Sequence, residues 1–434
     1  MEFLKRNKSI LQLSGANFLV LALPTLLLPV FSRLYTVADF AQFGIYTTII
    51  SLLLPVLNLH FQQAIPVPTE TRRVNALTQL CVLLLFILTS ILSLAWYFFP
   101  GFRALFDPED LMAGWYFLIP VGLLVLGLGQ ILQHWILQGH HFAHYAKSRS
   151  LMAISQSLLR YFAAFTAYSG GLMWSFIGGN LTQLLVFGSR FKPGKRESWI
   201  YIKETALLYI SFLKFGLPST ILFALSNFLP LILLAHYFQE EVVGQFSMAL
   251  RIGSIPIFLL ATAFGQVFFA ECRKAPERTA ELCAAFLKKG LNLTGYAIVV
   301  LIFIAKPLGL LLLGAEWAMA IDMVLVFVPA LWLNFLMLPL TNLFEIKNRQ
   351  DLGFYYALVA LVFRLAPIAI ALQYITDPVL VLLIMGIGVL ISNIFGFFIC
   401  QKMVVIPWFR VIKERLLVIL LATTAITFYF LFLY

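Results

Sequence analysis

Four basic residues lie inside long apolar stretches of this sequence, where ionisable side chains are rare. Arg160, Arg251 and Arg364 each fall near the middle of an apolar run, and Lys214 lies near the start of another. The carboxylates, by contrast, all lie at or beyond the ends of such runs. A lone cation in hydrocarbon costs ~3 kcal/mol on insertion scales, so it normally faces a bundle interior or a wet cavity. Cations without acidic partners predict an anionic ligand that comes from outside the chain.

Other polar residues accompany these cations. Arg33 ends the first apolar run and Lys214 lies close to a run's start, so both could instead extend their side chains to the membrane surface. Gln62 and Gln63 could form hydrogen bonds between helices or contact sugar hydroxyls. The planar guanidinium group donates two hydrogen bonds at once, which suits a diphosphate.

The composition is that of a membrane protein. Of the 434 residues, 62% are hydrophobic and only 11% are charged, against about a quarter charged in soluble domains. Apolar runs long enough to cross a bilayer predict thirteen helices. Their ranges are 10–32, 40–64, 75–99, 112–138, 149–168, 171–189, 208–235, 243–270, 290–313, 322–344, 353–375, 379–400 and 416–434. The sequence therefore predicts an all-α polytopic membrane protein.

The short connectors between these runs predict the orientation. Most of the 30 lysines and arginines fall in alternate connectors, beginning with Lys5, Arg6 and Lys8. The opposite connectors clearly hold only Arg103. Since cytoplasmic loops are enriched in lysine and arginine, the N-terminus is predicted to be cytoplasmic. This distribution also explains the net charge of +11 without a nucleic-acid partner.

The chain also shows a faint internal repeat. A constant shift superposes Gly15 on Gly216, Pro29 on Pro230, Asp39 on Glu240 and Pro55 on Pro256. These matches are compatible with chance, or with a parallel repeat of two six-helix lobes whose interface holds the substrate path. We expect an N-terminal lobe at 1–190, a cytoplasmic linker at 191–207 and a C-terminal lobe at 208–400. A connector and one extra C-terminal hydrophobic segment would occupy 401–434, whether or not that segment spans.

Motifs for catalysis or cofactors are absent from the sequence. There is no Walker A, HExxH, CxxC or GxSxG pattern, and the four cysteines have no metal-ligand spacing. His60, His134 and His236 fall near the ends of apolar runs, which predicts plain interfacial residues. We therefore expect neither a cofactor nor a bound metal, no enzyme activity, and a membrane potential or ion gradient as the energy source.

Several segments resemble the Wzx-type flippases of the MOP superfamily, which export O-antigen and exopolysaccharide units. These segments are LPVFSRLYTVADFAQFGIY with HFQQAIPVP, VVGQFSMALRIGSIPIFLLATAFGQVFF, and LLGAEWAMAIDM with FEIKNRQDL. They are spread over nearly the whole chain and occur in the family's order. The resemblance implies two six-helix lobes around a central cationic cavity, with Arg33 and Arg251 where that family carries cavity basic residues. In several relatives the position of Gln62 or Gln63 is acidic, so the resemblance does not settle the coupling ion.

The resemblance also implies a substrate and a location. An oligosaccharide linked to undecaprenyl diphosphate would pass from the cytoplasmic to the periplasmic leaflet of the bacterial inner membrane by alternating access. Membrane lipids, a polysaccharide polymerase and a chain-length regulator are the further partners expected. The alternatives are a flippase for lipid II or another lipid-linked precursor, a multidrug exporter, and a membrane-embedded polymerase. The last two are disfavoured because the runs hold no carboxylates and the longest outer connector, 100–111, is short.

Overall fold

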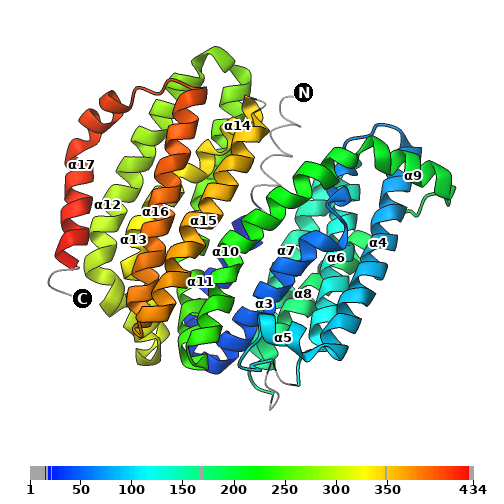
Figure 1. Cartoon of the computed structure of the whole chain (residues 1–434), viewed down its shortest axis with the longest axis horizontal. Coiled ribbons are helices and arrows are strands. Elements are labelled where there is room, and N and C mark those ends of the chain that lie inside the picture. Colours follow the sequence, from blue (N-terminus) through cyan, green and yellow to red (C-terminus); the bar gives the residue numbers. More distant parts are fainter. Residues whose placement is uncertain are drawn as a thin grey trace. The chain divides into compact units, whose positions relative to one another are not determined.

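The computed structural model describes residues 15, 18–20, 22–112, 114–166, 170–347 and 349–429. All the regular elements within these residues are helices. The chain divides into two compact units, an N-terminal unit of Met1–Gly244 and a C-terminal unit of Gln245–Tyr434 (Figure 1). The expected division into two six-helix lobes stays a prediction.

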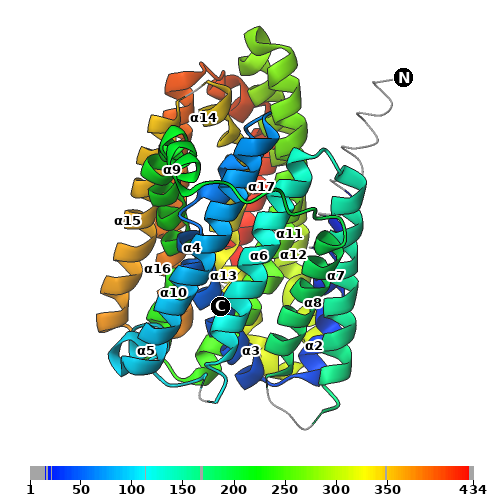
Figure 2. The ribbon, with the colours of Figure 1, turned by 90° about the vertical axis from the view of Figure 1, so that its right-hand side faces the viewer.

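The N-terminal unit is a bundle of long helices with short connections. Its helices are α2 (Leu28–Leu34), α3 (Val37–Leu57), α4 (Thr71–Phe98), α5 (Pro100–Phe106), α6 (Leu118–Gln138), α7 (Phe142–Ala163), α8 (Gly171–Gly188), α9 (Trp199–Leu208) and α10 (Leu217–Tyr237). In Figure 2, α6 lies beside α4 and α8, and α7 and α8 form a tightly packed antiparallel pair. Helix α3 is largely buried and supplies much of the core of this unit.

Helix α11 (Glu240–Lys274) begins at the end of the N-terminal unit and continues into the C-terminal unit. The C-terminal unit also contains α12 (Thr279–Leu313), α13 (Ala318–Leu340), α14 (Asn342–Ile346), α15 (Gln350–Tyr374), α16 (Pro378–Met403) and α17 (Trp408–Phe428). Within it α16 packs against both α13 and α15, and α17 lies along α12 (Figure 1). The Lys288 ammonium is 2.5 Å from the Glu414 carboxylate and joins α12 to α17.

Local sequence signals set where these helices begin. The Thr36 hydroxyl accepts a hydrogen bond from the Asp39 amide, and the Asp39 carboxylate accepts one from the Thr36 amide at 2.9 Å. This capping box satisfies two amides that a helix start leaves unpaired, so α3 begins at Val37. In the same way, the Asp377 carboxylate accepts from the amide of Val379 at the start of α16.

Each predicted apolar run is helical over most of its described residues. Eight helical segments of the described residues are long and apolar enough to cross a membrane. The helices α7, α8, α11 and α17 are not among these eight. The first run and the end of the last run lie partly outside the described residues. The chain is a multi-pass, all-helical membrane protein.

Two predicted runs are interrupted, which corrects the sequence-based bounds. The run 40–64 is helical only to Leu57, because Leu59 and His60 adopt positive φ angles of 46° and 65° before a 3₁₀ turn, Phe61–Ala64 (η1). The run 208–235 begins with a π-helical turn, Phe212–Gly216 (η2), ahead of α10. The two interruptions pack against each other in the N-terminal unit.

Candidate functional site

The predicted site residue Arg160 is buried in the N-terminal unit. Its side chain, on the last turn of α7, is 5% exposed, and its guanidinium carbon lies 5.2 Å from the ring centroids of both Phe31 and Phe43. The Tyr35 hydroxyl donates a 2.6 Å hydrogen bond to the Arg160 carbonyl and fixes this turn of α7. Among the described residues no carboxylate pairs with Arg160, and its Nε has no hydrogen-bond partner.

Two aromatic faces thus surround a cation that lacks a counter-ion. A guanidinium within ~6 Å of an aromatic centroid is attracted to the ring by ~0.5–2 kcal/mol, depending on how far it is desolvated. That attraction offsets part of the cost of burial but supplies no hydrogen-bond acceptor for the guanidinium. The Arg160 guanidinium therefore keeps hydrogen-bond donors that suit an anion with several acceptor oxygens.

The predicted residue Arg33 is close in sequence to Phe31, which contacts Arg160, but its environment differs from that of Arg160. It occupies the last turn of α2, two residues after Phe31, and its side chain is exposed. The helix α2 contacts α7, so both arginines belong to one region of the N-terminal unit. Exposure is what the sequence predicted for an arginine at the membrane interface.

Gln62 and Gln63 lie at the other end of α3, beside the interruption at Leu59–His60. Gln62 is 4% exposed and its Oε1 has no hydrogen-bond partner, whereas Gln63 is exposed and its Oε1 lies 3.1 Å from His134 Nε2. The predicted interfacial residue His134 is in fact buried, and its Nδ1 lies 2.8 Å from the Gln130 carbonyl oxygen. Asn58 is completely buried, with no partner for either atom of its side-chain amide.

Lys214 lies in the π-helical turn that packs against this interruption. Its side chain is exposed, in agreement with a side chain that extends to the surface. The adjoining Gly216 lies against the His60 ring, since a Cβ atom there would be 2.5 Å from His60 Cδ2. The Thr220 hydroxyl donates to the Gly216 carbonyl at 2.9 Å and is 3.5 Å from His60 Nδ1.

The remaining predicted arginines belong to the C-terminal unit. Arg251 lies on α11 and is half-buried, and Arg364 lies on α15 and is 9% exposed. The structure thus groups Arg33 with Arg160, and Lys214 with Gln62 and Gln63, in two regions of the N-terminal unit. Each group occupies a different end of α3.

The C-terminal unit joins two of the sequence segments that resemble known flippases. The Gln245 amide nitrogen donates a 2.6 Å hydrogen bond to the Glu316 carbonyl, and its oxygen accepts one from the Ala320 amide at 3.0 Å. The neighbouring Gly314 has a φ of 107°, which favours glycine, and Trp317 is fully buried. These contacts fix the start of α13 against α11.

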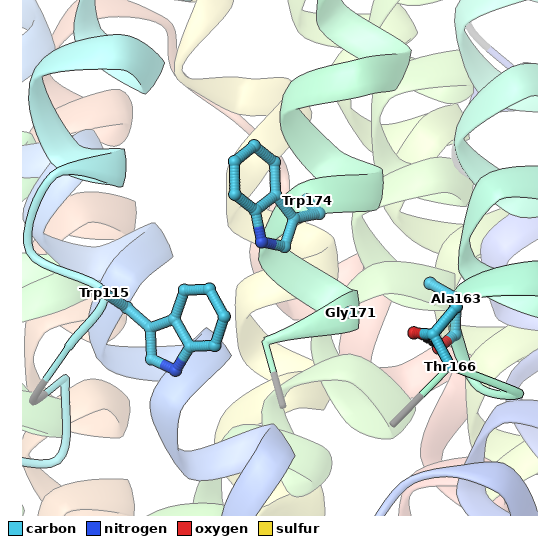
Figure 3. A pocket seen from close by; sticks show the side chains of 5 residues that line it. All are labelled: Trp115, Ala163, Thr166, Gly171 and Trp174. Carbon is cyan, nitrogen blue, oxygen red and sulfur yellow. Dashed lines mark hydrogen bonds between the residues drawn. The ribbon is translucent and has the colours of Figure 1, made fainter. Parts of the chain in front are cut away.

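One pocket was not predicted from the sequence. Figure 3 shows Trp115, Ala163, Thr166, Gly171 and Trp174 around a mainly apolar space of about 410 Å³ in the N-terminal unit. The two indole rings are 6.4 Å apart and nearly perpendicular. Tertiary packing brings together Trp115, in the connector before α6, and Trp174, in the first turn of α8, so the signal in the sequence was their position near the ends of apolar runs.

Comparisons with known proteins identify the family and the fold of the chain. Residues 30–322 match the family described as "Polysaccharide biosynthesis protein". The structure is similar to that of the lipid II flippase MurJ in an inward closed conformation, with a TM-score of 0.74 and 14% identity over 96% of this chain and 97% of that one.

Two more distant solved structures share the fold. A MOP superfamily transporter from Pyrococcus furiosus gives a TM-score of 0.60 at 17% identity, covering 91% of this chain and 95% of that one. The MATE multidrug transporter DinF-BH in complex with R6G gives 0.61 at 12% identity, covering 92% and 94%. No curated protein matches the sequence significantly. The family match spans more than half of the residues, so this chain belongs to the polysaccharide biosynthesis protein family and has the fold of the MurJ and MATE transporters.

Proposed function

We propose that the chain is a flippase. It would move an oligosaccharide linked to undecaprenyl diphosphate from the cytoplasmic to the periplasmic leaflet of the bacterial inner membrane, with its own N-terminus in the cytoplasm. Family membership supports a role in polysaccharide biosynthesis, and the fold supports transport by alternating access rather than catalysis. The polymerase and chain-length regulator of the same pathway are proposed partners.

The observation that carries this proposal is the buried Arg160 without a carboxylate partner. A diphosphate brings about two negative charges and several acceptor oxygens, which matches the unused donors of a guanidinium. The carboxylates of the described N-terminal unit all lie in the first turns of long helices, in α9 or in connectors. None of them lies within a long helix beyond its first turn, so a cationic drug would find no counter-charge midway along these helices, which disfavours a multidrug exporter.

We assign the substrate contacts in two groups. Arg33, Arg160, Arg251 and Arg364 would bind the diphosphate at successive stages of its passage. Lys214, Gln62 and Gln63 would contact the headgroup and glycan at the end of the N-terminal unit where α3 is interrupted. The polyprenyl chain would remain in the lipid throughout.

A flipping assay in proteoliposomes tests the proposal. The purified chain would be reconstituted with undecaprenyl-diphosphate oligosaccharide, and transfer measured by the exposure of the glycan to a lectin added outside. Arg33→Ala, Arg160→Met and Arg251→Ala should each weaken apparent affinity about 10- to 100-fold, since a hydrogen bond to a charged group is worth ~1.5–3 kcal/mol. Normal transport by all three variants would refute capture by arginine.

A flippase for lipid II is the second candidate, because the MurJ structure matches over nearly the whole chain. Lipid II carries the same diphosphate, so the arginines alone do not separate the two substrates. Competition separates them, because unlabelled lipid II at equal concentration would reduce transfer of the labelled oligosaccharide by about half if both enter the same site with similar affinity. Transfer of lipid II in the absence of any oligosaccharide transfer would assign the chain to the lipid II reaction instead.

A further inference from the structure

The interruption after α3 combines backbone strain with unsatisfied polar groups. Leu59 and His60 have positive φ angles, which cost of order 1–3 kcal/mol each in residues other than glycine. Asn58 and Gln62, on either side, are buried with amide atoms that have no hydrogen-bond partner. Such features persist where a site is functional, because the surrounding fold must hold them against their own energy.

The geometry of His134 limits its protonation states. Its Nδ1 faces the Gln130 carbonyl oxygen at 2.8 Å, and since a carbonyl only accepts hydrogen bonds, Nδ1 carries a proton. Its Nε2 faces the side-chain amide of Gln63, whose Oε1 is 3.1 Å away. In this orientation of the amide, Oε1 accepts a hydrogen bond from Nε2 when Nε2 carries a proton, that is, in the charged form of the ring.

The amide of Gln63 can accommodate either charge state of this ring. A neutral His134 presents a lone pair on Nε2, which requires the NH₂ group of Gln63 as donor. A charged His134 presents an N–H, which requires the Gln63 oxygen as acceptor. The two amide orientations are nearly isosteric. Gain or loss of one proton at His134 therefore corresponds to rotation of the Gln63 amide by half a turn.

We propose that His134 is a proton-binding site that couples the transport cycle to the proton gradient, with Gln63 as its positioning residue. The lone pair of Nε2 takes a proton from water that reaches the exposed Gln63 side, and Gln63 turns its oxygen to the new N–H. When His134 releases the proton to water, the Gln63 amide turns its NH₂ group back toward Nε2. The charge therefore balances over the cycle. The coupling to transport rests on the proposed function, whereas proton binding does not.

The charges around His134 are consistent with a single, exchangeable proton. The elements packed against α6 are α3, α4, α7, α8 and η1. Their titratable groups are Asp39, Tyr46, Arg72, Arg73, Cys81, Tyr97, His144, Tyr145, Lys147, Arg149, Arg160 and Tyr161. The one carboxylate, Asp39, lies in the first turn of α3, at the end away from His134.

The closest competing charge is that of His60, whose imidazole is near enough to His134 for the two cations to repel. Two side-chain oxygens of this region, Gln130 Oε1 and Gln62 Oε1, are buried without a hydrogen-bond partner. His60 also lies against Thr220 on α10. A proton at the interruption thus acts directly on the packing between α3 and α10.

Nuclear magnetic resonance of the full chain, labelled with ¹⁵N-histidine in lipid nanodiscs, tests the proton site without any substrate. Between about pH 5 and pH 8, the wild type should show one imidazole signal that shifts with pH and that is absent from His134→Gln. Gln63→Glu should raise the pH midpoint of that signal by about 1–3 units, because a carboxylate at hydrogen-bond distance favours the charged ring. Unchanged midpoints in Gln63→Glu would overturn the assignment.

His236 provides a matched control. Its Nδ1 faces the Ile232 carbonyl at 2.9 Å in the same local arrangement, and among the described residues its other nitrogen forms no hydrogen bond with a side-chain amide. The variant His236→Gln should remove a different signal and leave the His134 midpoint in place. A shift of that midpoint in His236→Gln would show that the titration reports a general change of the fold.

Transport assays then test the coupling. In proteoliposomes with undecaprenyl-diphosphate oligosaccharide, a gradient of one pH unit should change the equilibrium distribution about tenfold if one proton moves per cycle. His134→Gln should translocate without this dependence, and His236→Gln should keep it. If the distribution of the oligosaccharide in His134→Gln still depended fully on the pH gradient, the coupling would be wrong. It would also be wrong if the wild type flipped the substrate without any dependence on the gradient. Absence of flipping under every condition would instead reject the proposed function, while the titration would still decide the proton site.

Discussion

Replacement of Arg160 by methionine separates a functional cation from a structural one. Methionine replaces the aliphatic part of the arginine side chain, and thioethers pack favourably against aromatic rings such as those of Phe31 and Phe43. The hydrogen bond from Tyr35 ends on the Arg160 backbone carbonyl, so the substitution leaves it intact. The change therefore removes the charge and little else.

The expected change in stability follows from two opposing terms. A charged group in the hydrocarbon region costs ~3 kcal/mol on insertion scales. Each ring, at 5.2 Å from the guanidinium carbon, is near the outer limit of a cation–π contact and returns only ~0.5–1 kcal/mol. Arg160→Met should therefore raise the free energy of unfolding by ~1–2 kcal/mol, while transport falls at least tenfold.

Two measurements on the same preparation check this. Thermal unfolding of the purified chain in detergent, followed by tryptophan fluorescence, gives the stability, and the proteoliposome assay gives the flipping rate. Arg160→Lys is the control, because it keeps the charge and should not gain stability. If the methionine variant unfolds at a lower temperature than the wild type, the arginine is a structural residue and the reasoning is wrong.

Three further substitutions test the packing that holds the sites. Gly179→Ala on α8 should lower the unfolding free energy by ~1–3 kcal/mol, because its Cβ would lie 2.5 Å from that of Gln156, whereas Gly129→Ala has open space and should be tolerated. Gln245→Leu should cost ~2–3 kcal/mol of stability in the same unfolding assay, since it leaves two buried backbone groups unpaired. Asp107→Ala, in the connector after α5, should cost ~2 kcal/mol because the amides of Leu111 and Met112 lose their carboxylate acceptor. Burial raises the pKa of Asp107, so the stability that this carboxyl adds is full at low pH and falls as the pH rises through that pKa. When unfolding is measured at several pH values, the alanine variant should lack this decrease.

Much of the fold could be predicted from hydropathy alone, because each helix that crosses a bilayer must satisfy its own backbone within one long apolar run. The interruption of α3 could not be predicted in this way. Pro55 lies within the helix, and the left-handed residues are Leu59 and His60, which carry no turn signal. Only the surrounding tertiary packing holds them in that conformation.

The candidate site was predictable to the extent that it depends on single residues. An arginine near the middle of an apolar run must be accommodated, and Arg160 is buried as its position predicts. Pairs were not predictable, since Gln63 and His134 are 71 residues apart in sequence and meet only through the packing of α6 on the interruption. His134 near a run end indicated an interfacial residue, and the structure instead places it among buried amides.

The two regions of the N-terminal unit are too far apart to act on each other by charge alone. Arg160 lies 18 residues beyond the start of α7, or about 27 Å along its axis at 1.5 Å per residue, and His134 lies near that start, on α6. At this separation a Coulomb interaction at an effective dielectric of 20 is only about 0.6 kcal/mol. One element touches both: α3 stacks Phe43 on Arg160 and ends at the interruption beside His134. The direct electrostatic interaction is too weak to couple a proton to a bound anion within this unit, so such coupling requires a movement of helices, and α3 is one helix that reaches both regions.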